Sequence, residues 1–370
     1  MNTYLFSIES AIITFPLIAF LLSLPYMIYQ YHKYGSIPWL RTLVVYSFLL
    51  YIINMYCLAI LPLPNPEEVA KLTTPRYQLL PFYFIIDLVR HANTTLQGTT
   101  LAFAIVKDPE FYTTILNVLM FVPFGIYMRY YFKLSLKKTI LFSFLFSLFI
   151  ETTQLSGLYF IYPRPYRLFD VDDLIINTLG GLIGYTIAPI ITFLLPSRDT
   201  IDNTSIQHAG KVTTFRRLSA IIIDYIILQI LLILLQLLFH ISTNNIYHFI
   251  YFIYFFLSTL LTNGHTIGKR AVKIKIVGIR PPINKKAYIF RYALLYLIIF
   301  QAFPIGIQIL MFLLSSPQSI ILKIIFYSIV VICFTINIIF FIEILISLFK
   351  RNYHFFYEKL SNTKNTSTFY

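Results

Sequence analysis

Continuous apolar runs, each about as long as a membrane-spanning helix, recur along the chain and restrict its possible folds more than any other feature. A helix of about 20 residues rises 1.5 Å per residue and crosses the bilayer's hydrocarbon core, which is about 30 Å thick. Strands of a membrane β-barrel would instead alternate over segments of about ten residues. We therefore predict an all-α, polytopic integral membrane protein.

The composition excludes two other classes of protein. Only 12% of the 370 residues are charged and 58% are hydrophobic, whereas soluble domains carry roughly 25% charged residues. The 36 Phe and 29 Tyr provide too much apolar surface for a disordered chain. The net charge of +14 lies mostly in short loops between apolar runs, so we attribute it to membrane orientation and expect no nucleic-acid partner.

The apolar windows predict about nine transmembrane helices in two bundles, five followed by four. They lie near residues 4–29, 42–61, 112–130, 139–158, 174–196, 218–240, 246–262, 288–314 and 319–349. In this layout 22 of the 29 Lys and Arg fall on one side of the membrane and 7 on the other. Cytoplasmic loops carry the excess of Lys and Arg, so the amino terminus is predicted outside and the carboxyl terminus in the cytoplasm.

A polar stretch divides the two predicted bundles. We predict a membrane domain over residues 1–196, a cytoplasmic linker over 197–214 and a second membrane domain over 215–365. Residues 77–90 are apolar but too short to span, which indicates an interfacial or re-entrant helix.

Ionisable and amide side chains of the first domain are predicted to meet at one depth, near its outer surface. Glu151 and Gln154 share a face of the fourth predicted helix. The fifth begins with a run of carboxylates, and the glycines that follow share a face that is predicted to let a neighbouring helix approach closely. A carboxylate inside a membrane span costs at least about 2.5 kcal/mol, so each needs a partner or a purpose. The candidate ligand-binding residues are Arg76, Asn117, Glu151, Gln154, Arg167, Asp170, Asp172, Asp173 and Asn177.

Three interpretations of these residues remain open. Asp170 and Asp172 could cap a helix while Glu151 pairs with Arg167 to hold the preceding loop. The residues could instead bind a ligand from outside the cell or at the depth of the lipid headgroups. Carboxylate oxygens also suit a hard cation, but no loop spacing of the Ca²⁺ type is present. We expect no metal and no cofactor.

The first domain resembles the VanZ-like membrane proteins over about residues 1–196. The resemblance rests on Asn117 with the Pro-Phe-Gly that follows it, on Glu151-x-x-Gln154, and on the segment from Arg167 to Asn177. It implies a multi-pass protein of the bacterial cell membrane, associated with lower susceptibility to teicoplanin-type glycopeptides. The partners it implies are membrane lipids and a lipid-linked cell-wall precursor or lipoglycopeptide.

The second domain resembles the RDD family over about residues 211–365. The resemblance rests on Arg217, Asp224, a Gly-x-Thr-x-Gly-Lys segment and a tail motif, in which Glu358 stands where the family usually has Asp. A short strand is predicted in the Lys-rich stretch that follows the glycine segment. The predicted charged network at the inner face comprises Arg217, Asp224, Lys269, Arg291, Glu343 and Glu358.

Two interpretations of this inner network remain open. Three functions of the whole chain also remain open. The network could be a buried set of ion pairs that fixes helix packing, or it could relay a cation or proton. The chain could bind envelope material at its outer face, or modify a lipid headgroup or glycan with Glu151 as general acid. It could also transport an ion or small molecule through its second domain.

Overall fold

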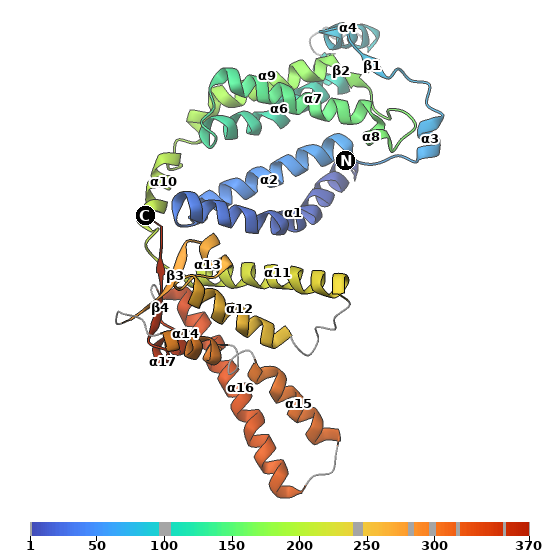
Figure 1. Ribbon diagram of the computed structural model, residues 1–370. Coiled ribbons are helices and arrows are strands. Elements are labelled where there is room, and N and C mark those ends of the chain that lie inside the picture. Colours follow the sequence, from blue (N-terminus) through green and yellow to red (C-terminus); the bar gives the residue numbers. More distant parts are fainter. Residues whose placement is uncertain are drawn as a thin grey trace. The chain divides into compact units, whose positions relative to one another are not determined.

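A computed structural model of the protein describes residues 2–95, 105–239, 247–279, 285–295, 301–315, 319–350 and 353–369. The chain forms two compact units. Unit 1 comprises Met1–Leu21 with Trp39–Ile201, and unit 2 comprises Leu22–Pro38 with Asp202–Tyr370. Nearly all regular structure in the described residues is helical, as Figure 1 shows, which confirms the predicted all-α class.

Six helices in the described part of the chain are long and apolar enough to cross a membrane. They are α1 (Asn2–Tyr34), α2 (Trp39–Ile60), α6 (Pro109–Tyr130), α9 (Val171–Ile191), α11 (Thr214–Phe239) and α16 (Ile320–Phe349). Each coincides with one of the predicted windows. The multi-pass membrane class is therefore confirmed.

The other three predicted spans correspond to helices outside this set. The 139–158 window contains α7 (Leu136–Leu155), and the 246–262 window contains the shorter α12 (Tyr247–Leu261). The third window, 288–314, divides between α14 (Lys285–Tyr292) and α15 (Gln301–Ser315), and its residues 296–300 lie outside those described. The total of nine spans stays a prediction.

Helices α6 and α7 both pack against α9 in unit 1. The packing is close because α9 carries glycines where the neighbouring backbone approaches. A Cβ atom added at Gly180 would lie 2.2 Å from the carbonyl oxygen of Val118, and one at Gly184 would lie 2.0 Å from that of Val122. Small residues let membrane helices approach closely, so the predicted small-residue face is confirmed as a packing surface.

Short elements lie between the long helices of unit 1. They are α3 (Pro66–Ala70), β1 (Tyr77–Gln78), α4 (Tyr83–Thr95), α8 (Gly157–Phe160) and β2 (Phe169–Asp170). Strands β1 and β2 pair in parallel, which brings the 77–90 segment beside the start of α9. The helix predicted in that segment is α4, and its place at a membrane surface stays a prediction.

Unit 2 contains a small antiparallel sheet besides its helices. Strand β3 (Ile274–Gly278) is the strand predicted in the Lys-rich stretch, and it pairs with β4 (Thr363–Ser367) at the end of the chain. Two short helices, α13 (Ile267–Ala271) and α17 (Phe356–Leu360), precede these strands. The tail therefore folds back onto unit 2.

The predicted linker is partly helical, and unit 2 takes part of its core from early in the chain. Helix α10 (Arg198–Gln207) occupies much of the 197–214 stretch. Tyr31 is buried in a hydrophobic cluster with residues of α11 and β3. Its ring lies 4.9 Å from the guanidinium of Arg216, so residues 202–370 alone contain only part of unit 2's core.

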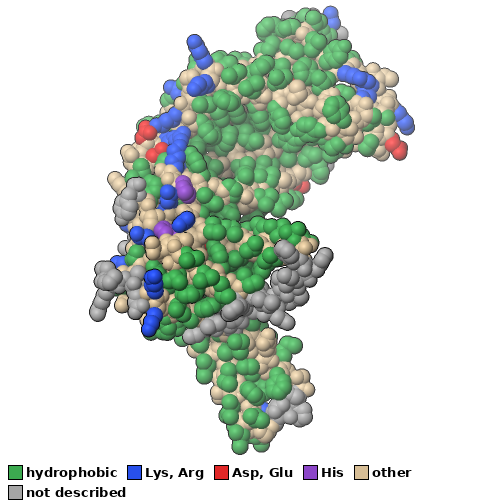
Figure 2. Space-filling view, in the orientation of Figure 1, with side chains coloured by type: hydrophobic (Ala, Val, Ile, Leu, Met, Phe, Trp, Pro, Cys, Tyr) green, Lys and Arg blue, Asp and Glu red, His purple; other side chains and the backbone are tan. Residues whose placement is uncertain are grey.

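Most of the surface over the long helices is apolar. Figure 2 shows hydrophobic side chains covering the helices of each unit, with Lys and Arg gathered near helix ends. Ile190 of α9 and Leu238 of α11 are 77% and 70% exposed. Soluble monomers rarely expose large contiguous apolar patches, so this surface fits contact with lipid.

Candidate functional site

Four carboxylates of unit 1 lie around the start of α9. Glu151 comes from α7, Asp170 immediately precedes α9, and Asp172 and Asp173 lie in its first turn. We call these four residues the acid cluster. Glu151 and Asp172 are each only 2% exposed, so the fold brings together side chains that the sequence predicted to meet.

Asp170 and Asp172 act on the backbone. The Asp170 carboxylate accepts a hydrogen bond from the Asp172 N–H at 2.8 Å and caps α9. Asp172 accepts the N–H groups of Phe82 at 2.5 Å and Phe84 at 2.8 Å, which fixes the entry into α4. One of the open interpretations had Asp172 cap a helix, and the N–H groups that it accepts are those of Phe82, just before α4, and Phe84, in the first turn of α4.

Asp173 connects α9 to α6 and α7. Its carboxylate accepts a hydrogen bond from Asn117 Nδ2 at 2.8 Å, and its carbonyl lies 3.4 Å from the Ser147 hydroxyl. That hydroxyl also accepts from Asn177 Nδ2 at 2.9 Å. Asn177 is 6% exposed and its Oδ1 has no hydrogen-bond partner among the described residues.

Glu151 lies against the loop that leads into α9. Its Oε2 accepts the backbone N–H of Asp170 at 3.1 Å. One turn later, Gln154 donates to the carbonyl of Ala59 at 2.9 Å and joins α7 to the end of α2. Both residues on the predicted α7 face are therefore engaged inside unit 1.

The two candidate arginines of this region are engaged through backbone groups in different ways. Arg167 donates to Leu61 O at 3.0 Å, and Arg76, which is exposed, accepts the Phe169 N–H through its own carbonyl at 3.1 Å. The ion pairs among the described residues do not include the expected pair of Glu151 with Arg167. Burial raises the pKa of the Asp170 carboxyl above its ordinary value.

The hard-cation interpretation gains no support from the geometry. Among the residues that the structure describes, no group of three or more His, Cys, Asp or Glu side chains could hold a metal ion. The carboxylates of the acid cluster accept hydrogen bonds from several different backbone N–H groups. Their oxygens are therefore better placed to accept hydrogen bonds from a ligand than to surround one metal ion.

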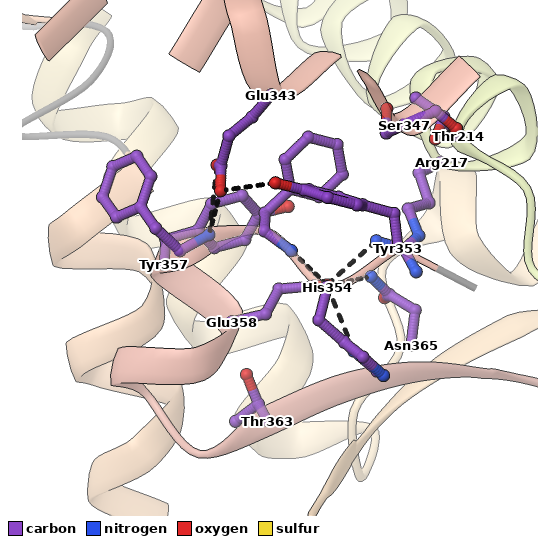
Figure 3. A network of polar contacts seen from close by, with 12 residues as sticks. Thr214, Arg217, Glu343, Ser347, Tyr353, His354, Tyr357, Glu358, Thr363 and Asn365 are labelled. Carbon is purple, nitrogen blue, oxygen red and sulfur yellow. Dashed lines mark hydrogen bonds and ion pairs between the residues drawn. The ribbon is translucent and has the colours of Figure 1, made fainter. Parts of the chain in front are cut away.

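A second polar centre lies in unit 2, around Glu358 of α17 (Figure 3). Glu358 is fully buried, and its carboxylate pairs with Arg217 at 2.9 Å and Arg291 at 3.0 Å. Asn365 of β4 donates to the same carboxylate at 2.7 Å. Arg291 also donates to Thr363 at 2.7 Å, so the tail is tied to both cations.

Asp224 and Glu343 bind hydroxyl and backbone N–H groups rather than the two arginines. Asp224 accepts hydrogen bonds from Tyr254 at 2.6 Å, from Thr266 at 2.5 Å and from the Gly268 N–H at 2.7 Å. Glu343 accepts from the Tyr353 hydroxyl at 3.0 Å and from the Phe356 N–H at 3.1 Å. Among the described residues of unit 2, Glu358 is therefore the carboxylate of the predicted network that pairs with Arg217 and Arg291, while Asp224 and Glu343 bind other groups.

Lys269 is buried beside these centres. It is 6% exposed, and its Nζ donates to the Tyr292 hydroxyl at 3.2 Å. Its ammonium lies 5.9 Å from the ring centroid of Phe255. Burial lowers the pKa of Lys269 from 10.5 to about 8, although the charge of Asp224 opposes the shift.

This lowered pKa predicts a pH-dependent stability. Between about pH 8 and pH 10.5 the unfolded chain still binds a proton that folded Lys269 has released, so the free energy of unfolding rises with pH. Unfolding of the full-length protein in detergent, measured across this range, should show the rise. Lys269→Met should flatten it, and an equal rise in that variant would contradict the assignment.

A buried arginine of unit 2, Arg216, was not among the residues selected from the sequence. It is 1% exposed and donates to backbone carbonyls of Val272 at 2.7 Å, Lys273 at 2.9 Å and Ala209 at 2.9 Å. It thereby joins α11 to the two residues between α13 and β3 and to the segment after α10. The adjacent arginines of the sequence were the available signal, and only Arg217 was selected.

Comparison with known proteins supports one of the two resemblances. Residues 48–193 match the family described as VanZ/LLP1. The matched segment contains all four carboxylates of the acid cluster together with Asn117 and Asn177. Neither the curated proteins nor the solved structures include a match to the chain.

Proposed function

We propose that the protein is a bacterial cell-membrane protein whose acid cluster binds a donor-rich group of cell-envelope material at the outer face. The ligand is a lipid-linked cell-wall precursor or a teicoplanin-type lipoglycopeptide. The observation that supports the proposal is that the described contacts use only part of the acceptor capacity of both carboxyl groups: Glu151 accepts a hydrogen bond from the Asp170 N–H, and Asp173 accepts one from Asn117. An ionised carboxylate can accept about four hydrogen bonds, so acceptor capacity remains for hydroxyl, amide or ammonium groups.

The predicted orientation supports an outer position of this cluster. The excess of Lys and Arg in alternate loops favours an amino terminus outside the cell. With that orientation, the start of α9 and the end of α7 face outwards. The resemblance of residues 48–193 to the VanZ/LLP1 family supports a role in the envelope and in glycopeptide susceptibility.

Within the same proposal, unit 2 is an RDD-like domain. The motif residues behind that resemblance meet in space, since Asp224 binds the Gly268 backbone and Arg217 pairs with Glu358. Asp224 accepts three hydrogen bonds that join α11 to α12 and α13. These contacts favour a packing role over transport.

Replacing Glu151 by Gln tests the binding proposal. The amide oxygen can still accept the Asp170 N–H, while the second carboxyl oxygen is replaced by an NH₂ group that cannot accept a hydrogen bond. Leaving a buried donor of the ligand without its partner costs about 1–3 kcal/mol, so we expect ligand binding to weaken by about tenfold. In a teicoplanin-susceptible host expressing the protein, the minimal inhibitory concentration should fall towards that of the empty host.

Glu67→Gln is the matched control, because Glu67 is an exposed acid of the same unit. Both variants are compared at equal membrane abundance, measured by quantitative immunoblotting. Unchanged susceptibility in Glu151→Gln at equal abundance would remove the proposal. An altered lipid-linked precursor in expressing cells would instead favour an enzyme acting at the same cluster.

A further inference from the structure

Basic residues gather at one end of unit 2. Helix α13, strands β3 and β4, and helix α17 lie together there, next to the start of α11, as Figure 1 shows. Figure 2 shows Lys and Arg side chains over this end. The Lys and Arg residues of this basic end that are not buried, with those of the adjoining α14, are Arg270, Lys273, Lys275, Lys285, Lys286, Lys359 and Lys364.

The register of the sheet places two of these lysines on its outward face. Alternate residues of β3 and β4 are buried, beginning with Ile274 and Thr363. Lys275 is opposite Thr366, and Lys364 is opposite Val277. The two lysines are therefore diagonal neighbours on one face of the sheet. Residues at such positions are about 7–8 Å apart.

This positive charge has little compensation within the unit. Between residues 202 and 370 the sequence has four acidic residues, and three of them are Asp224, Glu343 and Glu358. All three are buried and already bound to the partners described above. The fold therefore uses its carboxylates internally and leaves the lysines of the sheet facing outwards.

The basic end lies beside the start of α11 and follows the end of α16, two helices long and apolar enough to span a membrane. Lys350 follows directly on α16, and Lys211 precedes the first residue of α11 by three positions. The outward sheet positions carry Lys, Val and Thr but no aromatic ring. Proteins that bind single-stranded nucleic acid stack bases on aromatic side chains, so this face fits a charged leaflet better.

We propose that the basic end of unit 2 binds the anionic headgroups of phospholipids in the membrane that the protein spans. Lysines close to a membrane surface are attracted to anionic lipids, each by about a factor of five in affinity. Lys275 and Lys364 contact the headgroup directly, and the neighbouring Lys and Arg side chains add to the positive electrostatic potential around it. The interaction is independent of the acid cluster and of its ligand.

The test measures binding of a phosphatidylglycerol with a fluorescent acyl chain to the full-length protein in dodecyl maltoside, by fluorescence anisotropy. The double variant Lys275→Gln/Lys364→Gln should weaken binding about 25-fold, since two such lysines are removed. The matched control, Lys71→Gln/Lys323→Gln, removes the same charge elsewhere and should bind as the parent does. Affinity of the parent should fall as salt rises from about 0.05 to about 0.5 M.

Competition experiments distinguish an anionic phospholipid from other ligands of the basic end. Unlabelled phosphatidylglycerol should displace the probe, whereas phosphatidylcholine, inorganic phosphate and a single-stranded oligonucleotide should not. Displacement by any of these three at the same concentration would overturn the proposal, as would equal loss of binding in the two double variants. If the sheet variant does not fold, the salt titration of the parent decides, because an affinity unchanged by salt excludes a charged headgroup site.

Discussion

Glu358→Gln is expected to destabilise unit 2 by about 3–5 kcal/mol, the usual effect of removing one partner from a buried ion pair. The substitution keeps the shape of the side chain but leaves Arg217 and Arg291 buried without their shared counter-charge. The tail should then detach, because Glu358 also binds Asn365 of β4. Thermal unfolding in detergent and protease cleavage within residues 353–369 both report this change.

Two further variants test whether the destabilisation by Glu358→Gln comes from the loss of the buried ion pair. Asp199→Asn removes an exposed ion pair with Lys133, and surface pairs contribute little, so its unfolding temperature should match the parent's. Adding Arg291→Gln to Glu358→Gln should recover part of the loss, since one unpaired cation is removed. A Glu358→Gln protein as stable as the parent, with an equally protected tail, would show that the pair does not hold unit 2 together.

Features that depend on short stretches of sequence could be predicted. The long apolar windows predicted the six spanning helices because length and apolarity are properties of one segment. The glycines of α9 predicted close packing for the same reason, since their spacing places them on one helical face. The strand in the Lys-rich stretch also follows from local sequence, but its partner in the tail does not.

The partners of buried charges depend on tertiary structure and could not be predicted. Arg217 and Glu358 are 141 positions apart, and they meet because the tail folds back as α17 and β4. Asp172 and Phe82 are 90 positions apart, and they meet because β1 pairs with β2. The sequence could group Arg217, Asp224, Lys269, Arg291, Glu343 and Glu358 into one charged network, but it could not say which of these residues contact one another.

Gly184→Val is expected to destabilise unit 1 by about 3 kcal/mol, at the upper end of overpacking effects. The new Cβ would lie 2.0 Å from the carbonyl oxygen of Val122, and α6 must move away because a backbone carbonyl cannot rotate aside. Even Gly184→Ala should destabilise the unit. Alanine gains about 1 kcal/mol in helix propensity, but the same close contact opposes that gain.

The acid cluster should respond to this packing change. Asn117 on α6 donates to Asp173 on α9, so separation of the two helices removes that hydrogen bond and should lower the proposed glycopeptide protection together with stability. Gly210→Ala is the control, because a Cβ there meets no atom within 4 Å. A Gly184→Val protein with the parent's unfolding temperature in detergent would show that α6 and α9 do not need this close approach. The position of Asp173 would then have to depend on α7 and the preceding loop alone.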